Sequence, residues 1–304
     1  MNRRSLTSVT FSFVLTAISI VAGTCDVSLV QQSYPYLSTG SLSSAKLVDL
    51  PTGVVLRSGE MKITQKDLDA EIGKAPSDVR SQLKRNLFFV LENKAMQMFV
   101  QYEASEWAKG KKLSGSQEDP VESYLASLAQ GLSVTDDESK AFFDSSKDVM
   151  GNATFDQVKD QIKEHILNQK RQDAVKAHIA TISDRYEIDL NKAWVAKQYS
   201  AAMANPIDKA RQSGKPTMVD LGADGCRPCE MMTPILEELK KQYEGKVNIL
   251  FVHVRKEQIL AARYGVQSIP VQIFFDKAGK EVFRHVGFFP KDKIVSKLAE
   301  MGVQ

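Results

Sequence analysis

The sequence predicts two domains, a mostly α-helical one over residues 54–190 and an α/β one over residues 191–304. In the first, Thr64, Thr135 and Thr154 are each followed three residues later by an acid or amide, the pattern of a capped helix start. In the second, strand-length apolar runs alternate with amphipathic helices, as is typical of α/β folds. The length of 304 residues and a hydrophobic content of 43% are enough to give each domain a core.

The N-terminus has the features of a secretory signal. A charged stretch containing Arg3 and Arg4 precedes an apolar run over residues 11–22, which is shorter than the about 20 residues of a membrane-spanning helix. We therefore expect residues 1–24 to be a signal peptide and the chain to act outside the cytoplasm. The arginine pair is shared with twin-arginine signals but is common in any charged n-region.

Cys25 lies directly after this apolar run, where bacterial lipoproteins carry the cysteine that is acylated. The resemblance implies a lipid anchor in the inner membrane, with Asp26 matching a retention signal. Ordinary cleavage near Gly23 or Thr24 is the alternative, because the residues before Cys25 depart from the lipoprotein pattern. The Ser/Thr/Gly-rich composition that follows predicts a flexible tether over residues 25–53.

The first domain is expected to begin with a short strand at residues 54–56 and then to be helical. Residues 77–109 are predicted to form one long helix, because apolar residues recur along one face. Phe88 and Trp107 are among the side chains that widen this apolar surface beyond one stripe, so the helix must be covered on several sides or present an apolar groove. Residues 154–182 are predicted to form another helix.

Several short sequence features of this domain follow a known order. They are Gly59-Glu60, residues 63–68, the long helix, and residues 134–138 before Phe142-Phe143. The pattern resembles the N-terminal domain of the SurA-type periplasmic chaperones, which implies binding of partly unfolded client proteins. Those proteins usually continue into a parvulin unit, which this chain lacks, so prolyl isomerase activity is not implied. The alternative is a helical dimerisation or spacer domain, since Met and aromatic residues at helical spacing are more often core than groove.

The second domain is expected to alternate strands and helices. Residues 215–221 read as a buried strand and residues 226–243 as a helix with apolar residues at helical spacing. The remaining elements follow in order: a strand at 247–254, a short helix at 258–264, a hairpin of 271–275 with 281–286, and a helix at 290–301.

The motif Cys226-Arg227-Pro228-Cys229 begins this helix, and Ser268-Ile269-Pro270 precedes the hairpin. Together they resemble the active site of the thioredoxin family. The resemblance implies that Cys226, at a helix N-terminus that favours a thiolate, attacks, and that Cys229 resolves the mixed disulfide. It also implies that Ile269 and a cis-Pro270 form the edge on which a substrate chain pairs.

Asp220 corresponds to the buried acid of that family and is expected to accept a proton from Cys229, with burial raising its pKa. The lysine that often accompanies this acid is replaced by Phe251, and the tryptophan before the first cysteine by Gly225. Arg227 and Pro228 stand where thioredoxin has Gly-Pro, so we expect them to tune the redox potential.

A zinc site is disfavoured as an alternative use of the cysteine pair. Zinc needs four ligands, the only other cysteine is Cys25, and the four histidines are scattered singly at His165, His178, His253 and His285. We expect these histidines to serve packing or the surface. An inert structural disulfide is a further alternative, which the helix-start position, Asp220 and Pro270 disfavour. No metal or other cofactor is expected beyond the redox-active disulfide.

The chain is therefore expected to be a thiol-disulfide oxidoreductase of the bacterial periplasm or cell envelope. Its partners would be protein clients with thiols or disulfides and a membrane or soluble redox partner. The net charge of +3, or +1 after Arg3 and Arg4 are removed, implies neither nucleic acid nor an anionic membrane surface as a partner. The alternative is a non-catalytic holdase or adaptor that docks partners through the thioredoxin-like domain, against which the retention of both cysteines argues.

Overall fold

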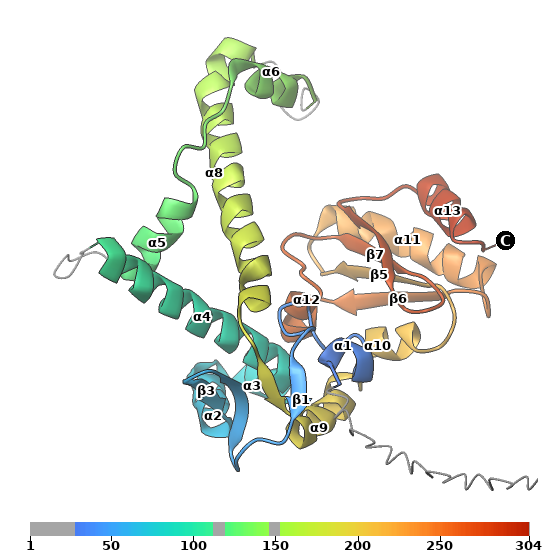
Figure 1. Ribbon diagram of the computed structural model, residues 1–304. Helices are drawn as coiled ribbons and strands as arrows, with labels where there is room; N and C mark the ends of the chain where they lie inside the picture. Colours follow the sequence, from blue (N-terminus) through green and yellow to red (C-terminus); the bar gives the residue numbers. More distant parts are fainter. Residues whose placement is uncertain (1–27, 112–118, 146–152, 304) are drawn as a thin grey trace, which may run out of the picture.

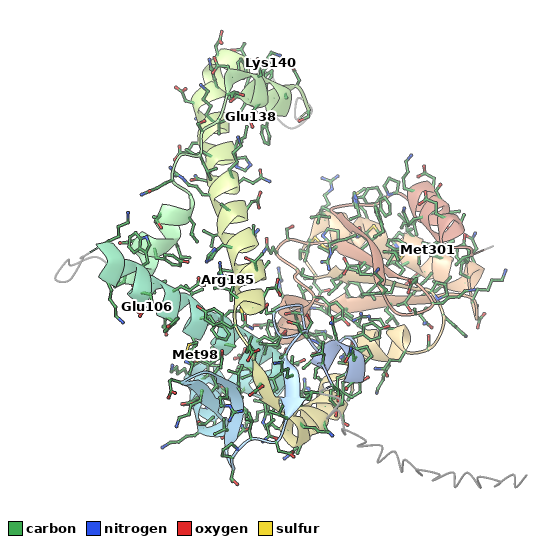
Figure 2. The ribbon with its side chains drawn as sticks, viewed as in Figure 1. Met98, Glu106, Glu138, Lys140, Arg185 and Met301 are labelled. Atoms are coloured by element: carbon green, nitrogen blue, oxygen red, sulfur yellow. A yellow bond between two sulfur atoms is a disulfide. The ribbon has the colours of Figure 1, made fainter. Side chains whose placement is uncertain are left out.

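The computed structural model describes residues 28–111, 119–145 and 153–303. The predicted signal peptide and Cys25 lie outside these residues. The chain forms a helix-rich N-terminal part, from which the long helix α8 (Phe155–Ile182) rises, and an α/β part beside it (Figure 1). In Figure 2, Glu138 and Lys140 lie near the far end of α8, and Arg185 lies near its base.

The N-terminal part contains a four-stranded sheet in the order β1-β4-β2-β3. The strands are β1 (Lys46–Val48), β2 (Val54–Ser58), β3 (Met61–Thr64) and β4 (Asp189–Asn191). β4 is parallel to β1 and antiparallel to β2, so the sheet joins the two ends of the helical segment. The other helices are α1 (Val30–Ser33), α2 (Gln65–Lys74), α3 (Ser77–Arg85), α4 (Leu87–Lys111), α5 (Pro120–Leu128), α6 (Asp136–Ser145), η1 (Ser183–Arg185) and α9 (Lys192–Ala202).

The three helix starts predicted from threonines are confirmed. Thr64 and Thr154 are the N-caps of α2 and α8, each within a capping box. At the start of α6, the backbone N–H of Glu138 donates to Oγ1 of Thr135 at 3.2 Å. At α2 and α6 the threonine hydroxyl accepts a hydrogen bond from the backbone N–H three residues later, and at α8 Oε1 of Gln157 accepts one from the N–H of Thr154 at 2.9 Å.

The prediction of one helix over residues 77–109 is wrong, because the segment is broken at Asn86 into α3 and α4. The Asn86 side-chain amide donates to the carbonyl oxygen of Gln82 at 2.9 Å, competing locally with helix geometry. The apolar side chains of α4 are covered, since Phe88, Leu91 and Phe99 are buried in the N-terminal core. The wide apolar surface of this segment is therefore core rather than a groove.

The expected flexible tether is also wrong over its described part, residues 28–53. Val30, Leu37 and Leu42 are buried in the same core, and β1 pairs with β4. The buried Glu92 carboxylate accepts hydrogen bonds from the backbone N–H of Thr39 at 3.0 Å and of Leu42 at 3.4 Å. The apolar residues interspersed among Ser, Thr and Gly anchor this segment against α4.

The boundary between the domains lies later than residue 190. Val195 and Ala202 of α9, and Met203 after it, belong to the N-terminal core. The α/β part then begins with α10 (Pro206–Arg211).

The α/β part contains a sheet in the order β6-β5-β7-β8, in which β5 is parallel to β6 and antiparallel to β7. α11 (Arg227–Gln242) and α13 (Lys291–Glu300) pack on one face, and α10 and α12 (Gln258–Arg263) on the other. The strands β5 (Thr217–Gly222), β6 (Asn248–His253), β7 (Val271–Phe275) and β8 (Glu281–Val286) agree with the predicted ones to within two residues.

Candidate functional site

The two cysteines of the motif form a disulfide at the N-terminus of α11. Cys226 is the N-cap residue, and the backbone N–H of Cys229 points back to its Sγ atom at 3.3 Å. Cys226 is partly exposed, whereas Cys229 is only 4% exposed. The sulfur of Cys226 is therefore the one that an incoming thiol can reach, and it lies in the positive field of the helix N-terminus.

The loop before β7 places a backbone edge beside this sulfur. The carbonyl oxygen of Ile269 lies 4.0 Å from Sγ of Cys226. The peptide bond between Ile269 and Pro270 is cis, and the carbonyl oxygen of Pro270 accepts a hydrogen bond from the N–H of Gly287 at 2.8 Å. Strand pairing thus holds the loop on one side, and Ile269 remains partly exposed on the other.

Asp220 lies in the middle of β5 and is completely buried. Its Oδ1 atom accepts a hydrogen bond from Nε2 of Gln272 at 2.7 Å, while Oδ2 has no partner among the described residues. Burial raises the pKa of Asp220 to about 6, against the opposing effect of the hydrogen bond from Gln272. A carboxyl group with this pKa can take up and release a proton near neutral pH.

Gln272 is a site residue that the sequence reasoning missed. It is fully buried on β7 and lies directly opposite Asp220 in the antiparallel pairing. Its signal in the sequence was the single polar side chain within the apolar run of residues 271–275. The pairing register, which is not local information, was needed to connect it with Asp220.

Gly222 brings the strand backbone close to the buried sulfur. A Cβ atom at this position would lie 3.3 Å from Sγ of Cys229 and 3.1 Å from the ring of Phe251. Phe251 pairs with Asp220 on the neighbouring strand β6 and is 44% exposed. An aromatic ring thus occupies the strand position next to the buried acid.

The two residues between the cysteines, Arg227 and Pro228, are exposed in the first turn of α11. Of the histidines, His253 lies 3.0 Å from the Asp224 carboxylate near the site, and His285 stacks on Phe289. His165 contacts Phe142, and His178 belongs to a polar cluster at the base of α8. Within residues 28–111, 119–145 and 153–303, no group of three or more His, Cys, Asp or Glu side chains could hold a metal ion.

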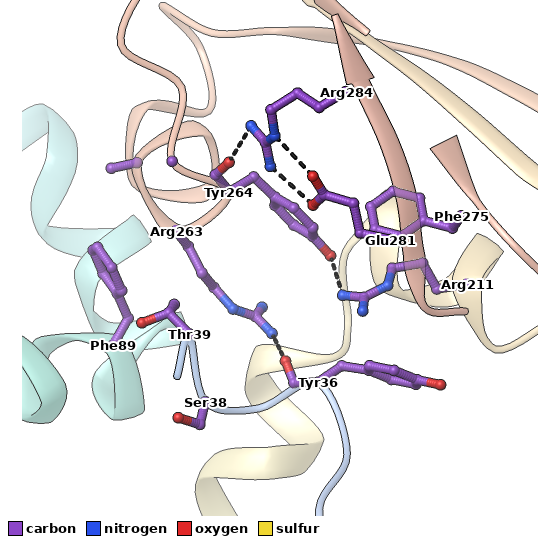
Figure 3. Close-up of a pocket in the computed structure, with 12 residues that line it drawn as sticks. Tyr36, Ser38, Thr39, Phe89, Arg211, Arg263, Tyr264, Phe275, Glu281 and Arg284 are labelled. Atoms are coloured by element: carbon purple, nitrogen blue, oxygen red, sulfur yellow. Dashed lines mark hydrogen bonds and ion pairs between the residues drawn. The ribbon is translucent and has the colours of Figure 1, made fainter. Parts of the chain in front are cut away.

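A cavity of about 550 Å³ lies between the two domains (Figure 3). Arg263 donates to the carbonyl oxygen of Tyr36 at 2.6 Å and is paired with Asp208 at 2.8 Å. Arg211 donates to the Tyr264 hydroxyl at 3.0 Å, and the guanidinium of Arg284 is paired with Glu281 at 2.8 Å. Because the guanidinium groups of Arg211, Arg263 and Arg284 are already paired, we interpret this cavity as a polar connection between the domains.

In the part of the chain that is described, no helix is both long and apolar enough to cross a membrane.

Comparisons with known proteins match the C-terminal part of the chain. A family model described as a thioredoxin-like domain matches residues 203–302. The thioredoxin of Chlorobaculum thiosulfatiphilum is 36% identical over 104 residues, which are 34% of this chain and 95% of that protein.

Two further thioredoxins give the same picture. That of Alicyclobacillus acidocaldarius subsp. acidocaldarius is 36% identical over 95 residues, covering 31% of this chain and 90% of that protein. That of Staphylococcus aureus (strain Mu50 / ATCC 700699) is 46% identical over 81 residues, covering 27% of this chain and 77% of that protein. The similarity thus spans most of each relative and about a third of this chain.

Proposed function

The chain belongs to the thioredoxin family through its C-terminal domain, and from this premise we propose that it is a protein thiol-disulfide oxidoreductase of the bacterial cell envelope. The observation that carries the proposal is the accessible sulfur of Cys226, at a helix N-terminus and 4.0 Å from the Ile269 carbonyl. A thioredoxin-like domain suggests thiol-disulfide exchange with protein substrates in general terms. Cys226 is proposed as the attacking cysteine and Cys229 as the resolving one.

In the oxidised protein, a client thiolate attacks Sγ of Cys226. The new bond joins the client to Cys226, the bond between Cys226 and Cys229 breaks, and Cys229 leaves as a thiolate. A second client thiolate then attacks the client sulfur and releases Cys226. The client gains a disulfide, and Cys226 and Cys229 become two thiols.

In the reduced protein the same steps run backwards and transfer two electrons to a client disulfide. Resolution then requires Cys229 to lose its proton, for which Asp220 is the proposed acceptor, with its pKa of about 6. A membrane or soluble redox partner supplies or removes the electrons. Ile269 and Pro270 are proposed to pair with the client backbone, and the exposed Arg227 and Pro228 to set the redox potential.

The N-terminal part is proposed to be a SurA-type domain that holds partly unfolded clients near the disulfide. Two features support this proposal. The arm formed by α5, α6 and α8 extends away from both sheets (Figure 1). The apolar side chain of Leu132, in the turn after α5, is also 37% exposed and so available to a client. The proposed location is the periplasm, with an anchor in the inner membrane if Cys25 is lipidated.

The catalytic proposal is tested by dithiothreitol-driven reduction of insulin disulfides with the full chain. Cys226→Ser should abolish turnover, and Cys229→Ser should accumulate mixed disulfides, because attack survives while resolution is lost. Glu237→Gln, an exposed change on the same helix, is the matched control and should keep full activity. Unchanged turnover in Cys226→Ser would contradict the assignment.

The client-holding proposal has its own test, in which both cysteines are replaced by serine. This variant should still slow the aggregation of a denatured protein without accelerating prolyl isomerisation. If aggregation is unaffected at several-fold molar excess, the N-terminal part is a spacer. If the parent chain holds clients but does not reduce insulin, the holdase or adaptor alternative is correct.

The anchor is tested by fractionation and intact mass. Cys25→Ala should move the protein from the membrane fraction to the soluble envelope fraction. A mature N-terminus at Cys25 without acyl mass would contradict lipidation.

A further inference from the structure

A groove of about 960 Å³ runs between α5 and α8 and reaches the redox domain. Its walls come from residues of α5 with the turn that follows, and from the C-terminal half of α8. Gln267, in the loop before Pro270, lines the same groove from the other domain. The groove therefore joins the arm of the N-terminal domain to the loop that borders the disulfide.

The groove has an apolar floor and a polar rim. The floor is formed by Val121 and Leu125 of α5, Leu132 of the turn after α5, and Val175 of α8, and all four are partly exposed to solvent. The rim carries charges of both signs, with Glu122 on α5 and Arg171 and Lys176 on α8. Because the rim carries charges of both signs, it does not favour ligands of one charge. The apolar content of a segment therefore decides whether it binds in the groove.

One end of the groove lies close in sequence to the residue that contacts the reactive sulfur. Gln267 is two residues before Ile269, whose carbonyl oxygen lies 4.0 Å from Sγ of Cys226. An extended chain advances about 3.3 Å per residue. A segment that leaves the groove past Gln267 therefore reaches the sulfur within a few residues.

We propose that this groove seats an apolar segment of an unfolded client chain and thereby selects client cysteines that lie a few residues from such a segment. The proposal rests on the proposed function, because it names the substrate feature that the same redox site would use. The occupant is a client rather than a second copy of this chain, because the groove ends at Gln267, two residues before Ile269, whose carbonyl oxygen borders the sulfur with which a client would react.

The test uses the full chain carrying Cys229→Ser, whose Cys226 forms a stable mixed disulfide. The probes are peptides with one cysteine activated as a thiopyridyl disulfide, so that each attack by Cys226 releases thiopyridone. An apolar segment of Leu, Val and Phe is placed about 3, 6 or 12 residues from the cysteine, and a Ser/Gly segment replaces it in the reference peptides. Thiopyridyl glutathione, which is too short to fill the groove, reports the intrinsic reactivity of Cys226.

The apolar peptide with short spacing should react about tenfold faster than its Ser/Gly reference, because one or two side chains become buried. Leu125→Asp and Val175→Asp should each remove this advantage without changing the rate with thiopyridyl glutathione. Ala177→Asp is the matched control, since it adds the same charge to an exposed position of α8 outside the groove. It should leave both rates unchanged.

A second readout does not depend on apolar-to-charged changes. A photo-crosslinking side chain at the exposed groove residue Gln172 should attach to the apolar peptide, and one at Ala177 should not. Equal rates for apolar and Ser/Gly peptides, or no crosslink at Gln172, would overturn the groove proposal. A normal rate with thiopyridyl glutathione in the same experiment would leave the proposed function intact. No reaction of Cys226 with thiopyridyl glutathione would instead overturn the proposed function itself.

Discussion

The Nε2 atom of His178 on α8 lies 2.8 Å from Oε2 of Glu103 on α4. The same carboxylate oxygen accepts a hydrogen bond from the hydroxyl of Tyr124 on α5 at 2.8 Å, and Oε1 is paired with Arg185 at 2.8 Å. Burial, followed by the interaction with Glu103, raises the pKa of Tyr124 to about 12, so its hydroxyl stays protonated. One carboxylate therefore joins α4, α5 and α8.

Glu103→Gln should loosen this junction. The neutral amide loses its charge-assisted contacts with Arg185 and the tyrosine, which should lower the free energy of unfolding by about 1–3 kcal/mol. Hydrogen exchange should accelerate in α5 and in the lower turns of α8. Glu106→Gln, one turn along and half exposed, is the control and should change neither quantity measurably. Unchanged protection of α5 in Glu103→Gln would show that apolar packing alone holds the arm.

Asp220→Asn should change both the free energy of unfolding and the pH dependence of thiol-disulfide exchange. The folded pKa of about 6 exceeds the ordinary aspartate value of 3.8, so the folded protein holds this proton more tightly than the unfolded chain. The associated stability is complete below about pH 4 and is lost as pH rises through about 6. Above that pH the buried charge costs about 3 kcal/mol, so Asp220→Asn should be more stable than the parent at pH 8 and similar at pH 4.

The kinetic consequence concerns resolution by Cys229. In the parent, release of a mixed disulfide should show an inflection near pH 6, which Asp220→Asn should lack. Gln272→Leu should move the inflection to higher pH, because it removes the hydrogen bond that lowers the pKa of Asp220. Stopped-flow measurement across pH 4–9 reports all three profiles. An identical inflection in Asp220→Asn would exclude this carboxyl as the proton acceptor.

Gly222→Ala should disturb the site without replacing either cysteine. The added Cβ would lie 3.1 Å from the Phe251 ring and 3.3 Å from Sγ of Cys229, so the ring or the sulfur must shift. We expect a loss of about 1–3 kcal/mol in stability and a changed redox potential against glutathione. Combining it with Phe251→Ala should recover much of the stability. If the double variant is no better than Gly222→Ala, the contact with Cys229 sets the cost.

Arg263→Met should weaken the connection between the domains. The Arg263 side chain is 4% exposed and its partner Asp208 is completely buried, so its removal leaves the Asp208 carboxylate with one remaining cation, Arg211 at 3.3 Å. Urea unfolding should show a loss of roughly 3 kcal/mol. The carbonyl of Tyr36 also loses its donor, so amides near Tyr36 should exchange faster. Arg255→Met, at an exposed position, is the control and should unfold like the parent.

The sequence alone determined the features that depend on local information. The helix starts at Thr64, Thr135 and Thr154 follow from side chains that reach backbone groups three residues away. The strands and helices of the C-terminal domain follow from apolar periodicity. Cys226, Cys229 and Asp220 were singled out as candidates by the resemblance of the motif and its preceding strand to the thioredoxin family.

Tertiary structure decided what depends on residues distant in the chain. Ser/Thr/Gly composition suggested a tether over residues 25–53, but pairing of β1 with β4 and the buried Glu92 hold its described part, residues 28–53, in place. Gln272 joins the site only through the register of β7 against β5. Gln267 lines the groove between α5 and α8 because of how the two domains are placed, which the local sequence does not show. Such contacts depend on how elements far apart in sequence pack and on the burial they share, which local periodicity and capping do not encode.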